Sequence, residues 1–79
     1  MTQEYTFYKT SATRRLTSYL TKAGFPGHQA IVAEDMQGVK TYLLCDENNM
    51  PYYESQCVEA VAVYIGMTSV AKKHLEART

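Results

Sequence analysis

The sequence contains few of the residues that carry catalytic and metal-binding chemistry. It has no tryptophan, two cysteines, two histidines and two prolines among 79 residues, and its net charge is zero. Cys45 and Cys57 lack the spacing of metal ligands, and the histidines form no HxxxH pair. No nucleophile stands near a base at a recognised catalytic spacing. We therefore expect no enzymatic activity, no catalytic residue, no metal site and no cofactor.

Long apolar runs are missing too. No uncharged span reaches the roughly 18 residues of a membrane helix, and the N-terminus lacks the pattern of a secretory signal. Two reduced, buried thiols are therefore favoured over a disulfide, and we expect a cytoplasmic protein with no membrane contact. A chain of 79 residues with 46% hydrophobic and 20% charged residues predicts a single globular domain over residues 1–79.

The zero net charge conceals an uneven distribution. Residues 1–28 carry four basic residues and one acidic residue, residues 29–59 carry six acidic and one basic, and residues 60–79 carry three basic and one acidic. Non-specific binding of nucleic acid needs several cations on one surface, so this balance alone does not indicate it. Mutual solvation of surface charges is the simplest interpretation.

The first helix is predicted by apolar residues at helical spacing. They form one stripe: Ala12, Leu16, Tyr19, Leu20 and Ala23. Thr10 or Ser11 can cap the start of this helix. Gly24 suits the left-handed residue after its end, Phe25 can fold back on Leu20, and Pro26 prevents continuation.

Four segments favour β-strands. Residues 4–9 alternate in a β-favouring composition, residues 29–34 and 39–45 resemble a hairpin whose loop ends at Gly38, and Tyr52 and Tyr53 begin a short edge strand. Together with the helices this predicts an α+β fold in βαββα order, with a short antiparallel sheet packed against two helices, or three.

The C-terminal region leaves two questions open. Residues 57–65 are either a helix or a buried strand, and the length of the run, Ala60 and Ala62, and Ser55 as a cap favour a helix. Gly66 either lies within one continuous helix or separates two. Apolar side chains surround residues 58–65, and one small sheet covers only one side of a helix, so we expect the first helix or a second chain, from a homodimer or a protein partner, to cover the rest.

A break at Gly66 would resemble a helix-turn-helix. Ala62, Ile65, Met67 and Thr68 fit that pattern, but Lys72 stands where the second helix needs an apolar residue. The alternative function is therefore a small DNA-binding regulator that uses residues 58–78. Its nucleic-acid contacts would be Thr68, Ser69, Lys72, Lys73 and Arg78.

Seven tyrosines are the other unusual feature. We expect Tyr19, Tyr42 and Tyr64 in the core, and Tyr8, Tyr52 and Tyr53 near the strand edges in an exposed, acidic aromatic patch. Tyrosine suits protein interfaces, and acidic neighbours favour a basic protein partner over nucleic acid. The predicted partner-binding residues are Tyr8, Asp46, Glu47, Tyr52, Tyr53 and Glu54. The favoured function is a small non-enzymatic inhibitor or adaptor that binds another protein, of the type encoded by phages and mobile elements.

Overall fold

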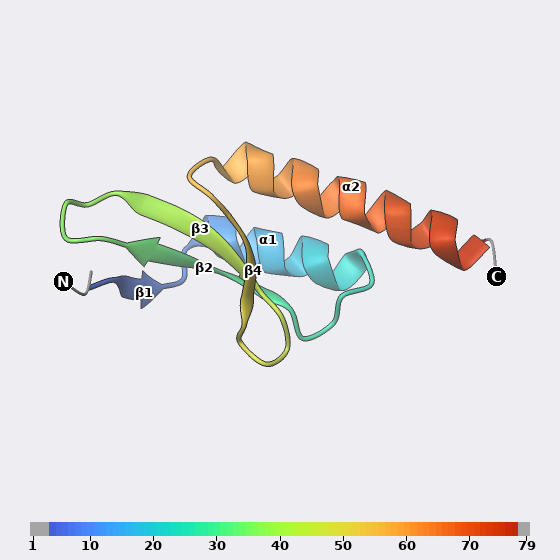
Figure 1. Ribbon diagram of the computed structural model, residues 1–79, viewed down its shortest axis with the longest axis horizontal. Helices are drawn as coiled ribbons and strands as arrows, with labels where there is room; N and C mark the ends of the chain where they lie inside the picture. Colours follow the sequence, from blue (N-terminus) through green and yellow to red (C-terminus); the bar gives the residue numbers. More distant parts are fainter. Residues whose placement is uncertain (1–3, 78–79) are drawn as a thin grey trace.

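The computed structural model describes residues 4–77, except for the side chains of residues 71 and 74–77. Its elements run in the order β1 (Thr6–Tyr8), α1 (Ser11–Lys22), β2 (Gln29–Glu34), β3 (Lys40–Cys45), β4 (Pro51–Ser55) and α2 (Val58–Ala77), as Figure 1 shows. The α+β class and the order of the elements are confirmed, and the expected edge strand at residues 52 and 53 is β4.

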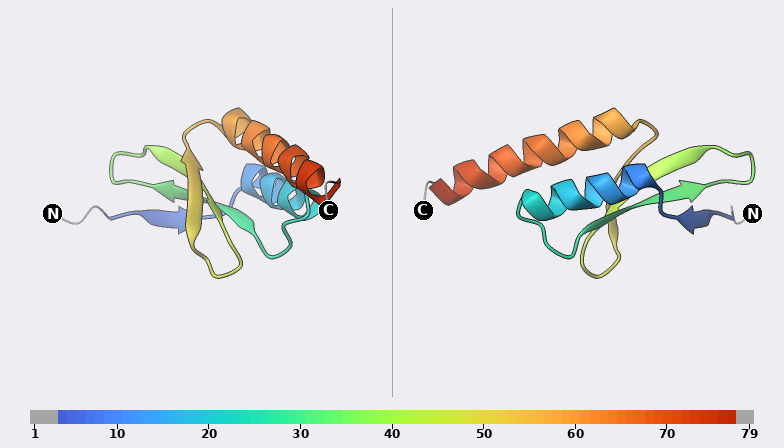
Figure 2. Two further views of the ribbon diagram at one scale, coloured as in Figure 1. Left: turned by 45° about the vertical axis from the view of Figure 1, so that its right-hand side comes forward. Right: turned by 180° about the vertical axis from the view of Figure 1, so that it is seen from behind.

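The four strands form one antiparallel sheet in the order β1-β2-β3-β4. Both helices lie on the same side of this sheet: α1 packs against β2, and α2 packs against α1 and β4 (Figure 2). The opposite side of the sheet is covered by no described element. We call it the open sheet face.

The core lies between the helices and the sheet. It consists of Leu16, Leu20, Ala30, Leu44, Val61 and Ile65. Each of these residues is at most 3% exposed. Ala30 pairs with Leu44 across β2 and β3, so both point to the helix side. Burial of each large aliphatic side chain contributes about 1.5–3 kcal/mol, which holds both helices against one side of the sheet.

The predicted start and end of α1 are confirmed. Thr10 is the N-cap and forms a capping box with Thr13. At the other end Gly24 has a φ of 93°, and the Phe25 N–H donates to the Leu20 carbonyl at 2.9 Å, which is the Schellman arrangement. The predicted burial of Tyr19 is wrong, because it is 45% exposed.

The buried side of α1 contains threonines in place of Tyr19. Thr13 is fully buried, and the Thr17 hydroxyl accepts a hydrogen bond from the Ala30 N–H of β2 at 3.0 Å. This bond satisfies a backbone donor in the sheet, so a polar residue replaces Tyr19 on the packed side of α1.

The turns of the β2–β3 and β3–β4 hairpins have the same hydrogen-bond pattern. Asp35 and Asp46 each accept hydrogen bonds from two backbone N–H groups of their own loop, at 2.9–3.0 Å. Gly38 and Asn49 occupy the equivalent left-handed position, with φ of 84° and 63°. Both residue types tolerate this conformation, which explains why the loops close in the same way.

Helix α2 is continuous. Gly66 lies inside it, so the helix interpretation of residues 57–65 is confirmed and the third helix does not form. A single glycine costs a helix only about 1 kcal/mol, and α2 packs against α1 and β4. Within residues 4–77, neither helix combines the length and hydrophobicity that crossing a membrane requires.

The two cysteine thiols differ in burial. Both cysteines are free, as expected, but only Cys45 is buried, and the predicted burial of Cys57 is wrong. Cys57 directly precedes α2, and its thiol donates to a Glu59 carboxylate oxygen at 3.1 Å. Burial and the nearby Asp46 carboxylate raise the pKa of the Cys45 thiol.

Candidate binding surface

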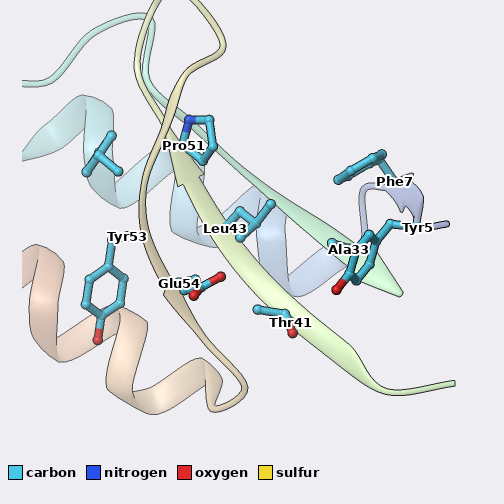
Figure 3. Close-up of a pocket in the computed structure, with 9 residues that line it drawn as sticks. Tyr5, Phe7, Ala33, Thr41, Leu43, Pro51, Tyr53 and Glu54 are labelled. Atoms are coloured by element: carbon cyan, nitrogen blue, oxygen red, sulfur yellow. The ribbon is translucent and has the colours of Figure 1, made fainter. Parts of the chain in front are cut away.

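The open sheet face has apolar side chains on β1, β2 and β3, with Glu54 on β4. Alternation along the paired strands places Phe7, Ala33, Thr41 and Leu43 on this side, together with Ile31. In Figure 3, Thr41 and Leu43 lie beside Glu54 and near Phe7 and Tyr5, whereas Tyr53 points toward the helix layer. The sheet is therefore apolar on both sides, although helices cover only one.

A hollow of about 640 Å³ lies over this face. Phe7 is 59% exposed and Tyr5 is 44% exposed, and their ring centres are 6.3 Å apart. Pro51 and Glu54 border the hollow from β4, and Glu54 is the one carboxylate among the residues that line it. The surface thus combines aromatic side chains at one edge with a negative charge at the other.

Tyr52 and Tyr53 differ in exposure: Tyr52 is 43% exposed, as the predicted aromatic patch requires, whereas Tyr53 is half-buried. The register of β3 and β4 shifts between Leu44 and Cys45, where Tyr52 is the additional residue of β4. Tyr53 stacks on Tyr64 of α2 with ring centres 3.9 Å apart and planes at 13°. Both tyrosines border the hollow, yet each of them makes its ring contacts with other parts of the chain.

Tyr52 also belongs to a second, smaller cavity. Its hydroxyl is 2.9 Å from Nδ1 of His28, and the cavity of about 260 Å³ also has Asp46 in its wall. Burial, followed by nearby acidic and phenolic groups, raises the pKa of Tyr52 to about 12. The Asp46 carboxylate is engaged in the β3–β4 turn, and Glu47 lies in the same turn with its side chain exposed.

Tyr8 lies far from the other predicted partner-binding residues. It is in β1, separated from β4 by two strands, and its hydroxyl donates to a Glu34 carboxylate oxygen at 2.5 Å. This hydrogen bond is the main cause that raises the pKa of Tyr8 to about 12. The predicted partner-binding set is thus divided between two sides and two edges of the sheet.

Four residues of the DNA-binding alternative lie close together in α2, but they differ in exposure and contacts. Thr68 and Ser69 are half-buried, and the Thr68 hydroxyl donates to the Tyr64 carbonyl at 2.8 Å. Lys72 donates to the Gly24 carbonyl, while Lys73 is exposed. Arg78 lies outside the described residues.

Sequence reasoning missed Tyr5, Phe7, Thr41 and Leu43 as surface residues. A signal was present, because residues 30–33 are four consecutive apolar residues in one strand. Such a run places apolar side chains on both sides of a sheet, whereas a sheet with one solvated side alternates with polar residues.

Comparisons with protein families, with curated proteins and with solved structures find no match to this chain. Among the described residues, no group of three or more His, Cys, Asp and Glu side chains is arranged to hold a metal ion.

Proposed function

We propose that this chain is a non-enzymatic binding protein that acts as an inhibitor or adaptor, and that the open sheet face holds its protein partner. The observation that carries the proposal is the exposure of Phe7 and Tyr5 beside a hollow of about 640 Å³ on an apolar side of the sheet. Large exposed apolar surfaces on small proteins commonly mark interaction sites.

The chemistry of the hollow supports a particular kind of partner. Phe7 and Leu43 offer apolar contact, and aromatic side chains are the residues that most often dominate binding energy. Glu54 offers one negative charge at the β4 edge. The partner that fits is a protein segment with a bulky apolar side chain and an adjacent lysine or arginine.

The DNA-binding alternative has less support. Helix α2 is continuous at Gly66, which leaves no turn to orient a recognition helix. Lys72 is engaged with the carbonyl of Gly24, so its charge is directed to the end of α1.

The test is comparative affinity capture with three forms of the protein. Phe7→Glu places a charge on the open sheet face, and Met36→Glu places the same charge in the β2–β3 loop, where the side chain is 83% exposed. We expect wild type and Met36→Glu to capture the same protein, and Phe7→Glu to lose it while circular dichroism stays native. Equal capture by all three forms would reject this surface.

Measuring the affinity for the purified partner then tests whether the charge of Glu54 contributes to binding. Glu54→Gln should weaken binding by less than Phe7→Glu and should reduce its salt dependence, because one charge pair is removed. A salt-sensitive gel shift with DNA, together with no protein partner, would instead support the regulator.

A further inference from the structure

The side of α2 that faces away from the core carries a second apolar surface. Val61 and Ile65 point into the core, whereas Val63, Met67 and Val70 are 60%, 69% and 55% exposed. In Figure 1, α2 runs along one border of the molecule, with α1 and the sheet on one side of it only. No other described element covers these three residues.

The spacing of this surface is typical of paired helices. Ala60, Val63, Met67 and Val70 follow one another at intervals of three, four and three residues, which is the a/d pattern of a helix that packs along a second helix. We call these four residues the outer stripe. A hollow of about 340 Å³ adjoins it, bordered by Tyr53 and Tyr64.

Charge determines which helix direction fits. Glu59 and Lys73 are both exposed and lie near opposite ends of the stripe, on the same flank because they are two heptads apart in the a/d pattern. In an antiparallel pair each flank meets the same flank of the other helix, so Glu59 approaches Lys73 of the second copy. In a parallel pair each flank meets the opposite flank of the other helix, so Glu59 and Lys73 would not pair with each other.

The register is self-complementary as well. With a twofold axis between residues 66 and 67, Val63 lies opposite Val70 of the second copy, and Met67 lies beside the second Gly66. A Cβ added at Gly66 would meet no atom within 4 Å, so there is room for the methionine side chain. The same register leaves Glu59 one residue from the opposing Lys73.

We infer that the chain forms a homodimer in which α2 pairs antiparallel with α2 of a second copy along the outer stripe. Such a contact is isologous, because one surface meets its own copy. The stripe and the open sheet face lie on opposite sides of the molecule, so dimerisation is independent of the proposed partner site.

Sedimentation velocity over a range of protein concentrations tests the association. We expect wild type to convert from monomer to dimer, and Met67→Glu to weaken the dimer by roughly a hundredfold or more, because two unpaired charges would be buried near the twofold axis. Met36→Glu is the matched control and should dimerise like wild type. A wild-type chain that stays monomeric at millimolar concentration would overturn the inference.

Disulfide trapping tests the direction of the helices. In a Cys57→Ser background, Val63→Cys and Val70→Cys chains are oxidised separately and as a mixture. We expect cross-linking only in the mixture, because residue 63 of one copy faces residue 70 of the other. Rapid cross-linking of Val63→Cys with itself, or none in the mixture, would contradict the antiparallel arrangement.

Charge reversal gives an independent check. Glu59→Lys and Lys73→Glu should each weaken the dimer, and the double variant should recover it, since the pairs are then restored with reversed sign. In a parallel dimer the double variant would match wild type, but neither single variant would weaken association, so the single variants distinguish the two arrangements.

Discussion

The ammonium group of Lys72 lies 4.8 Å from the centre of the Phe25 ring and donates a hydrogen bond to the carbonyl of Gly24. It joins the C-terminal part of α2 to the end of α1. A cation at this position favours the helix, because the last carbonyls of α1 carry partial negative charge. Lys72, which the sequence analysis considered for DNA contact, thus holds α2 against the end of α1.

The first prediction concerns this contact. Lys72→Met keeps most of the aliphatic chain and removes the charge, so it should lower the free energy of unfolding by about 1 kcal/mol. Lys73→Met, at the exposed neighbouring position, should change it by less than about 0.5 kcal/mol. Urea denaturation of the three proteins measures both effects, and equal stabilities would show that the Lys72 contact contributes nothing.

The second prediction compares Leu16, which is on the buried side of α1, with Tyr19, which was expected to be buried but is exposed. Leu16 is 1% exposed, so Leu16→Ala should destabilise the fold by about 2–5 kcal/mol. Tyr19 is 45% exposed, and Tyr19→Ala should cost about 1 kcal/mol or less. Thermal melting monitored by circular dichroism tests the pair. A larger loss at Tyr19 than at Leu16 would contradict this orientation of α1.

The third prediction isolates backbone conformation in a turn. Gly38 has a φ of 84°, and an added Cβ there would meet no atom within 4 Å. Gly38→Ala should therefore destabilise the protein by about 1–2 kcal/mol through the left-handed conformation alone. Asn49→Gly, in the matching position of the other turn, relaxes the left-handed conformation but removes the acceptor of the Gln29 Nε2 hydrogen bond at 2.8 Å, so it should change stability by less than about 0.5 kcal/mol. Chemical denaturation of both variants is the measurement, and an unchanged Gly38→Ala protein would refute the argument.

The fourth prediction concerns alkaline pH. The pKa values of Tyr8 and Tyr52 are raised from 10.0 to about 12 in the folded chain. Folding therefore favours their neutral forms. This contribution is complete below about pH 10 and is lost as the pH rises through about 12. Ultraviolet titration of tyrosinate should show a late component near pH 12 that Tyr8→Phe and Tyr52→Phe each reduce. Two unchanged titration curves would contradict these assignments.

Much of the fold could be predicted because its signals are local. The glycine at position 24 with Phe25 and Pro26 marks the end of α1, and Gly38 marks the hairpin turn, through backbone conformations that few other residues adopt. Strand β2 was bounded correctly because its composition and flanking turns agree. The helical state of residues 57–65 was also favoured correctly.

The surface was harder to predict, since it depends on pairing between distant segments. The additional residue at Tyr52 changes which side of β4 faces the helices, and no local signal in the sequence indicates a bulge there. Tyr19 was expected to be buried because it falls in the apolar stripe of α1, and Cys57 because it stands at the start of an apolar helix. Their exposure depends on how α1 and α2 are rotated against the sheet.

The bulge in β4 also affects how this molecule resists aggregation. An edge strand with regular, unpaired backbone groups is a template for strands of other molecules, and bulges and prolines interrupt that template. Here β4 begins with Pro51 and is irregular at Tyr52, while β1, at the other edge, has only three residues. Neither edge offers a long regular ladder, so the sheet is poorly suited to growing into fibrils even though both of its sides are apolar.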